Sequence, residues 1–400
     1  MLLKNSFYSL GGKVVNMILN IGSMAMLARL LTPKEFGIFA VIMALQAFFQ
    51  PILDMGLGPV YIKKEEITED FKNSFFTINL FLGCLNIIYL IIIGLFIHYF
   101  VNGVLFEYIF IFSLSIFFTS LTLIYNFHLT RELKFKELFY FNLISNISSI
   151  SMAIVVAYFG YGIWALIFKA LTMSLVMFLL VYFYTKIKFK VVSLEVIKQY
   201  LEDLKFGASI FINRIINGLF QSFDKLIIAK FYNTYLLGNY NNAKNLAIMS
   251  DSVIRTSLSG VVFSYMEKHN KTDYLKYYGI IFLISSLLPL LLFLWGDKVI
   301  LLWLGEQWVE ASKIIRPLSI FAIGMILKGI ITMIAMHNKN MKTLNIWNVL
   351  VGFCFLLILL ILSFFRYNLI NTLYIISMFF TLSWVLFFVK INIKNGEDYE

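Results

Sequence analysis

Long apolar runs constrain this chain most, because they recur from one end of the sequence to the other. Each is about 20 residues or longer, the length that an α-helix needs to cross the hydrocarbon core of a bilayer. Strands of a transmembrane barrel would be half as long and would alternate apolar and polar residues. Hydrophobic residues make up 60% of the chain and charged residues 14%, which excludes a soluble domain. The sequence therefore predicts an all-α polytopic membrane protein.

Hydropathy places twelve transmembrane helices, at about residues 8–31, 35–57, 73–99, 104–126, 138–159, 162–184, 206–230, 235–258, 276–296, 314–336, 343–365 and 369–389. The first run carries Lys13 and several asparagines and lacks a small-residue cleavage pattern, so we expect a retained helix. Cys84 and Cys354 lie in apolar runs of different halves, and we expect neither a disulfide nor a metal site. Trp295, Trp303 and Trp308 are expected to act as interfacial anchors.

An internal repeat divides the chain. Residues 3–39 align without a gap with residues 204–240, an offset of 201 positions. The matches that carry information are polar or glycine, since polar residues are costly inside apolar helices; they include Lys13 with Arg214, Asn16 with Asn217, Asn20 with Gln221, and Gly37 with Gly238. We predict two parallel six-helix lobes around a central cavity. Residues 1–200 form the N-terminal lobe, with a cytoplasmic linker at about 185–205, and residues 201–400 form the C-terminal lobe. The linker reads either as a short interfacial amphipathic helix or as a solvated connection.

Basic residues are distributed unevenly between the connections. The face that holds the N-terminus carries 19 Lys and Arg residues, and the opposite face carries 7. Because cytoplasmic connections of membrane proteins are enriched in Lys and Arg, both termini are predicted to be cytoplasmic.

Ten charged residues fall inside the predicted spans. Seven are basic and three acidic: Lys13, Lys169, Arg214, Lys225, Lys244, Arg255 and Lys328, against Asp54, Asp224 and Asp251. A charge at the centre of a span costs about 2.5–3.5 kcal/mol even on the lower scale, so these side chains should face a water-filled interior or one another.

Helical spacing suggests which residues line that interior. Lys13, Asn16 and Asn20 share one helix face, and their repeat partners share another. We predict a substrate cavity lined by Lys13, Asn16, Asn20, Lys169, Arg214, Asn217, Gln221, Lys244, Arg255 and Lys328. Ion coupling would use Asp54, Asp224 or Asp251. Other interpretations stay open: Asp224 with Lys225, or Asp251 with Arg255, as structural ion pairs; Lys13 and Arg255 reaching the interface; and the asparagines as interhelical hydrogen-bonding groups.

Two motifs point to a family. The run Ala28–Phe39 reads ARLLTPKEFGIF and is followed by DMGLG at Asp54–Gly58; Leu302–Trp308 reads LWLGEQW, and IRPL follows at Ile315–Leu318. These segments resemble the Wzx-type polysaccharide or O-antigen flippases of the MOP superfamily, which also contains MATE exporters and MurJ-like flippases. The resemblance covers nearly the whole chain, and the chain stops after the twelfth span, whereas some relatives carry extra C-terminal helices.

The resemblance implies a flippase in the bacterial cytoplasmic membrane. It would move an undecaprenyl-pyrophosphate-linked oligosaccharide to the outer leaflet by alternating access between two lobes. Lys and Arg suit a pyrophosphate headgroup, and amides suit sugars. The expected partners are the lipid-linked oligosaccharide, membrane lipids and glycan polymerases or other assembly proteins; no cofactor, metal or nucleic acid is expected.

Two rival functions stay open. A MATE-like ion-coupled small-molecule antiporter would favour a more acidic cavity than this chain offers. A membrane-embedded polymerase or acyltransferase would need a long external catalytic loop, which the sequence lacks, and the sequence also has no P-loop and no metal-spaced His/Cys set. We therefore predict a transporter and no enzyme.

Overall fold

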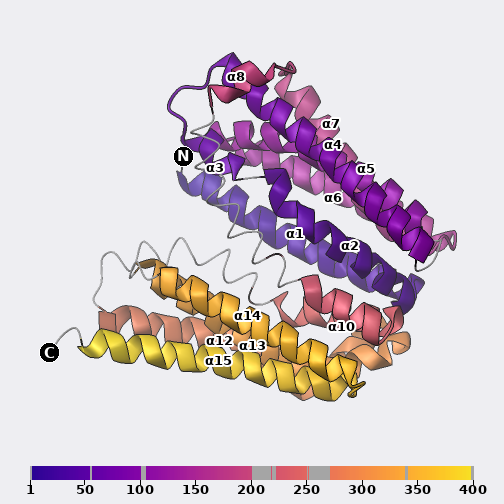
Figure 1. Cartoon of the computed structure of the whole chain (residues 1–400), viewed down its shortest axis with the longest axis vertical. Helices are drawn as coiled ribbons and strands as arrows, with labels where there is room; N and C mark the ends of the chain where they lie inside the picture. The colour runs from indigo at the N-terminus through magenta and orange to yellow at the C-terminus, as the bar shows by residue number, and fades with distance from the viewer. Residues whose placement is uncertain are drawn as a thin grey trace. The chain divides into compact units, whose positions relative to one another are not determined.

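The computed structural model describes residues 2–54, 56–100, 105–200, 218, 222–249, 251, 271–337 and 341–397, and in those ranges every regular element is a helix. The helices form two compact units (Figure 1). The first unit comprises Met1–Thr32 and Val41–Ser222, and the second comprises Pro33–Ala40 and Phe223–Glu400. The predicted lobe boundary at residue 200 adjoins residues 201–217, which lie outside the described ranges, so the lobe limits stay a prediction.

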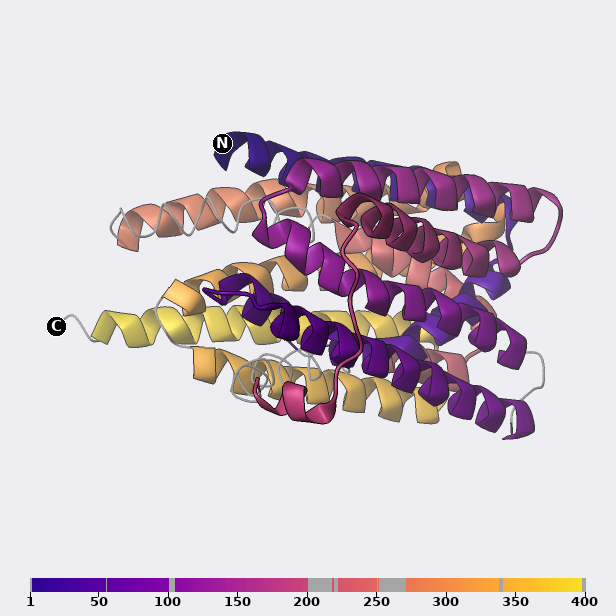
Figure 2. The ribbon, with the colours of Figure 1, turned by 90° about the horizontal axis from the view of Figure 1, so that it is seen from above.

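The first unit is built from long helices joined by short connections (Figure 2). Helix α6 packs between α1 and α7, and α5 packs against both α4 and α7. The elements are α1 (Leu2–Leu30), most of α2 (Pro33–Asp54), α3 (Leu57–Lys63), α4 (Glu69–Phe100), α5 (Leu105–Arg131), α6 (Phe135–Tyr158), α7 (Trp164–Thr185) and α8 (Leu194–Lys198).

Helix α13 is the centre of the second unit, where it packs against α10, α12 and α15. The helical elements of this unit are residues 223–231, α10 (Thr234–Ala247), α12 (Lys271–Leu304), α13 (Val309–His337), α14 (Met341–Phe364) and α15 (Leu369–Glu397). The first turns of α2 also belong to this unit, so α2 is shared between the two units.

Eight of the described helices are long and apolar enough to cross a membrane. A ninth span results if Pro33–Phe48 and Gln50–Lys63, which meet at an angle of 46°, are counted as one. That bend adjoins Pro51, as expected for a residue that removes a backbone donor from a helix. The seventh predicted span runs largely over residues outside the described ranges, and the eighth runs partly over them. A multi-pass helical membrane protein is therefore confirmed, and the full set of twelve spans stays a prediction.

The connection between α12 and α13 is shorter than predicted. It consists of Gly305 and the 3-10 turn Glu306–Trp308, and Gly305 has a positive φ of 106°. This tight turn directs the ring of Trp308 into the unit, where it is fully buried and meets Phe36 edge-on at 5.3 Å between centroids. The predicted role of Trp308 as an interfacial anchor is therefore wrong. Trp295, at 51% exposure, remains compatible with that role.

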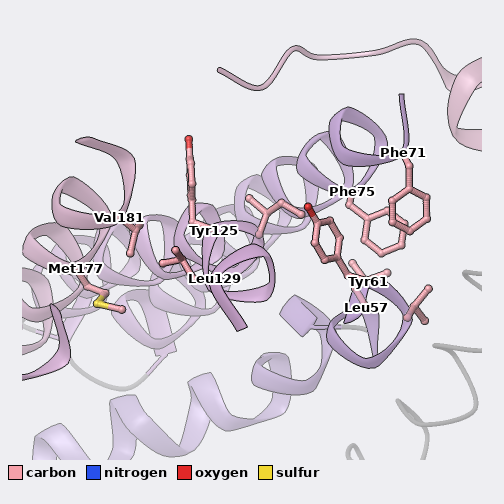
Figure 3. Close-up of a cluster of buried hydrophobic side chains, with 10 residues drawn as sticks. Leu57, Tyr61, Phe71, Phe75, Tyr125, Leu129, Met177 and Val181 are labelled. Carbon is pink, nitrogen blue, oxygen red and sulfur yellow. The ribbon is translucent and has the colours of Figure 1, made fainter. Parts of the chain in front are cut away.

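A buried aromatic cluster holds one end of the first unit together (Figure 3). Tyr61 of α3 packs on Phe71 and Phe75 of α4, and side chains of α5 and α7 complete the cluster. Arg131, the last residue of α5, donates to the backbone carbonyls of Tyr61 and Ile62 at 3.2 and 3.0 Å. An arginine thus satisfies carbonyls that the end of a helix leaves open.

Two glycines bring α2 and α10 into close backbone contact inside the second unit. A Cβ placed on Gly37 would lie 2.6 Å from the carbonyl carbon of Thr234, and one on Gly238 would lie 2.8 Å from that of Pro33. Both pairs, Gly37 with Gly238 and Pro33 with Thr234, are 201 residues apart. The crossing is therefore pseudo-symmetric, with equivalent first turns of the two repeat copies in mutual contact.

Candidate functional site

The polar residues of the first unit form bonds between its helices. Asn146 on α6 donates to the side-chain oxygen of Asn16 on α1 at 2.9 Å. The ammonium of Lys169 on α7 donates to the hydroxyl of Ser23 on α1 at 2.8 Å, and Ser23 is only 2% exposed. Two predicted cavity residues, Asn16 and Lys169, therefore join α1 to its neighbours.

The second unit buries an ion pair. One carboxylate oxygen of Asp224 accepts from the Lys244 ammonium and from the Tyr240 hydroxyl, the latter at 2.5 Å. The other oxygen accepts from the backbone N–H of Lys225 at 2.7 Å. Asp224 is fully buried. The ammonium that bonds the Asp224 carboxylate comes from Lys244 on α10, a pairing that the sequence interpretation did not include.

The two units use equivalent positions in the same way. Ser23 and Asp224 are 201 residues apart, so they occupy one position of the repeat. Each accepts a hydrogen bond from a lysine ammonium, from half-buried Lys169 in the first unit and from buried Lys244 in the second. Only the second unit places a carboxylate there, so the two lysines differ in whether their charge is balanced.

Aromatic rings surround the cations of the second unit. The Lys244 ammonium lies 5.5 Å from the centroid of Phe321, and the Lys328 ammonium lies 5.6 Å from that of Trp384. Phe380 connects the two rings, with its centroid 4.6 Å from Phe321 and 6.3 Å from Trp384. Such cation–π contacts partly replace the water that a buried ammonium loses.

The remaining predicted site residues are placed only in part. Asp251 is 4% exposed, and its carboxylate lies near Gly329, where a Cβ would be 3.3 Å from Oδ1. Asn20 is exposed on α1. The side chains of Lys13 and Asp54 lie outside the described residues, and so do Arg214, Asn217, Gln221 and Arg255. In the part of the chain that the structure describes, no three His, Cys, Asp or Glu side chains are grouped as a metal site requires.

Three partners were not found from the sequence. Asn146 and Tyr240 bind Asn16 and Asp224, two candidate site residues that the sequence analysis did identify. Asn239, which is fully buried, accepts from the backbone N–H of Ala311 at 2.9 Å and so caps the first turn of α13. Tyr240 could have been found from the internal repeat. The offset of 201 aligns it with Phe39, so the second copy adds a hydroxyl group to an aromatic position.

Known proteins resemble this chain along most of its length. An uncharacterized membrane protein in the cps region of Klebsiella pneumoniae is 22% identical over 329 residues, covering 77% of this chain and 65% of that protein. The teichuronic acid biosynthesis protein TuaB of Bacillus subtilis strain 168 is 22% identical over 315 residues, covering 76% and 65%. The chain thus spans just under two thirds of the length of these relatives.

Solved structures show the fold. A lipid II flippase MurJ in an inward closed conformation superposes with a TM-score of 0.71 at 17% identity, over 96% of this chain and 87% of that chain. An inward-facing multidrug resistance MATE family transporter of the MOP superfamily gives 0.70 at 12% identity, over 96% of both chains. The fold is therefore that of the MOP transporters.

The family follows from the sequence itself. Residues 26–313, well over half of the chain, match the family described as Polysaccharide biosynthesis protein. The fold of the chain, its long apolar helices and the names of its relatives all agree with that family match. The chain belongs to the polysaccharide biosynthesis protein family, and its fold is that of the MOP superfamily.

Proposed function

We propose that this protein is a flippase for a lipid-linked oligosaccharide. It moves an undecaprenyl-pyrophosphate-linked repeat unit of an O-antigen, capsule or exopolysaccharide from the cytoplasmic to the outer leaflet of the bacterial cytoplasmic membrane. The family match over residues 26–313 carries this proposal. The names of the relatives, a cps-region membrane protein and a teichuronic acid biosynthesis protein, support a glycan substrate, and the fold of a lipid II flippase supports a lipid carrier.

The charges inside the spans agree with an anionic headgroup. Among the predicted intramembrane charges whose side chains the structure describes, four are lysines and two are aspartates: Lys169, Lys225, Lys244 and Lys328 against Asp224 and Asp251. A pyrophosphate needs cations that are held away from bulk water, where charge-assisted hydrogen bonds are strong.

The function is tested by reconstituting the purified protein in vesicles with a fluorescent undecaprenyl-pyrophosphate oligosaccharide. A flippase exposes substrate of the inner leaflet to an impermeant quencher, so the quenched fraction should rise from about half to nearly all. Undecaprenyl-pyrophosphate without the sugar serves as the control for glycan recognition. Quenching that stops at the level of protein-free vesicles contradicts the proposal.

The internal repeat suggests which residues contact the headgroup. Lys13 and Arg214 are equivalent, and we propose that they hold the pyrophosphate from the two lobes. Each charge-assisted contact contributes about 1.5–3 kcal/mol, so Arg214→Ala should weaken substrate binding by roughly ten- to a hundredfold. Arg214→Lys should retain part of the activity, because it keeps the charge and loses the planar fork. Normal flipping by a Lys13→Ala, Arg214→Ala double variant at normal abundance contradicts this site.

The proposed orientation makes a separate prediction. With Cys84 and Cys354 replaced by serine, a cysteine at Lys188 should react with an impermeant maleimide only from the cytoplasmic side. A cysteine at Tyr161, which is 64% exposed between α6 and α7, should react only from outside. The reason is the excess of basic residues on the face of the N-terminus. Labelling of both positions from the same side contradicts the topology.

An ion-coupled small-molecule antiporter is the second candidate. It is favoured by the MATE family transporter, whose chain is covered to 96%, and by the buried Asp224 cluster in the second unit. An antiporter would expel a cationic dye from vesicles when an ion gradient is applied, and an Asp224→Asn variant would stop that expulsion. Dye transport without oligosaccharide flipping would decide in favour of this candidate.

A further inference from the structure

The segment that follows α7 is extended and is fastened to the first unit. Lys186, with a φ of 53°, ends α7, and residues 186–193 continue without helix to α8. We call residues 186–192 the lysine strap. Figure 2 shows it as the magenta segment that crosses to α8. Its sequence, KIKFKVV, alternates lysines with apolar residues, and in an extended chain alternate side chains point to opposite faces.

One face of the strap is packed. Ile187 and Phe189 lie against the buried aromatic cluster of Figure 3. The Phe189 ring stacks on Phe76 of α4 at 5.0 Å and meets Tyr125 of α5 at 5.0 Å. These contacts decide which face of the strap points outward, and that face carries the lysines.

Hydrogen bonds fix the backbone of the strap to α4. The N–H of Lys190 donates to the side chain of Asn73 at 2.9 Å, and the N–H of Val192 donates to Thr77 at 3.1 Å. Beyond α8, the hydroxyl of Tyr200 lies 3.1 Å from that of Thr68. The strap is thus held along its length, so its lysines are ordered by a packed backbone.

The exposed face carries three lysines at alternate positions of the chain. Lys186, Lys188 and Lys190 are all exposed, and successive ones are about 7 Å apart along an extended chain. Among the described residues no carboxylate lies within ion-pairing distance of these three. Two acids at the ends of the helices that contact the strap, α4 and α5, have other partners: Glu69 pairs with Lys72 at 2.7 Å, and Glu132 pairs with Lys134 at 2.5 Å. Lys134 lowers the pKa of the Glu132 carboxyl through that hydrogen bond.

The strap begins at the level of the membrane interface. The last turn of α7, a membrane span, exposes Tyr182, Phe183 and Tyr184, at 39%, 66% and 43%. Exposed aromatic rings at the end of a span mark the depth of the lipid headgroups. The three lysines follow within the next six residues, so they lie where phosphate groups are found.

We propose that the lysine strap is a binding surface for the headgroups of anionic phospholipids in the adjoining leaflet. Each lysine near an anionic surface contributes about 1 kcal/mol, a factor of about five in local lipid concentration. Because the strap is bonded to α4 and packs on the buried aromatic cluster, lipid held there lies at the end of the first unit where α7 ends. This surface is independent of the transport substrate.

The test measures which lipids surround the strap. Full-length protein with Cys84 and Cys354 replaced by serine carries an environment-insensitive fluorophore on a cysteine at Val191, which is 66% exposed. It is reconstituted in neutral vesicles that contain either spin-labelled phosphatidylglycerol or spin-labelled phosphatidylcholine, both with the quencher high on the acyl chain. We expect quenching by phosphatidylglycerol to reflect at least about fivefold enrichment at low salt, falling as salt is raised.

Three variants separate charge from other causes. Lys186→Gln, Lys188→Gln, Lys190→Gln should remove the preference, and the corresponding triple arginine variant should keep it. As a matched control, glutamine at Lys230, Lys298 and Lys313, which lie on the opposite predicted face, should leave the preference for phosphatidylglycerol unchanged. Equal quenching by the two lipids in the unmodified protein overturns the proposal, and so does an undiminished preference in the triple glutamine variant. Loss of glycan export in that variant with unchanged lipid preference overturns it in favour of a protein partner.

Discussion

Replacing Gly238 by alanine is expected to destabilise the protein severely. The added methyl group would lie 2.8 Å from the carbonyl carbon of Pro33 and closer still to its oxygen. Backbone atoms cannot rotate away as a side chain can, so the first turns of α2 and α10 must separate. Overpacking of this kind typically lowers the free energy of unfolding by about 1–3 kcal/mol, and for a clash with backbone we expect a loss of about 3 kcal/mol. A large fall in the melting temperature of the purified protein in detergent checks the prediction.

The chain provides matched controls for that experiment. Gly22 and Gly279 are helical glycines with no atom within 4 Å of an added Cβ, so alanine there should be neutral or stabilise by up to about 1 kcal/mol. Gly37→Ala should behave like Gly238→Ala, because the two positions are equivalent. The double variant should cost less than the sum of the two, since both open the same crossing. Unchanged stability of Gly238→Ala would refute the close contact.

Replacing Asp224 by asparagine is expected to have the second largest effect. The variant keeps an acceptor for the Tyr240 hydroxyl and leaves the Lys244 ammonium buried without a counter-charge. Breaking a buried pair by removing one partner costs about 3–5 kcal/mol, and asparagine should lie near the lower limit because it keeps part of the hydrogen bonding. The melting temperature and the amount of protein in the membrane should both fall.

Two further variants show whether the cause is the unpaired charge. Adding Lys244→Met to Asp224→Asn should restore most of the stability, because it removes the uncompensated cation. Glu310→Gln breaks a pair of the same kind, Glu310 with Lys313 at 2.8 Å, but that lysine side chain is 51% exposed, so the loss should stay below about 1 kcal/mol. If the double variant is no more stable than Asp224→Asn, the ion pair does not explain the loss.

The sequence predicted the helices better than their partners. Apolar runs locate spans because a bilayer leaves few other options for backbone groups, and α4 to α7 follow the predicted ranges within a few residues. The offset of 201 also identified Gly37 and Gly238 as a matched pair. It could not show that they are in contact, because alignment relates positions in a repeat and does not say which surfaces meet.

The partners of the charged residues were harder to predict for a physical reason. Spacing within one helix shows which side chains share a face, whereas Lys169 reaches Ser23 on a helix 146 positions away in sequence. Trp308 was assigned to the interface by its residue type, and a tight turn directs it inward. Arg214 and Arg255 lie outside the described residues, so their predicted roles stay predictions.

The division of α2 between two units changes how the halves of the chain are joined. Because Pro33–Ala40 belong to the second unit and Val41–Asp54 to the first, the chain passes from one unit to the other after Thr32, after Ala40 and after Ser222. A protein with two independent domains and one linker passes across only once. Two turns of helix made by the first half therefore complete the second unit, as an exchanged segment does in a domain-swapped dimer. The second half, synthesised alone, would therefore lack two turns of helix that complete its own compact unit.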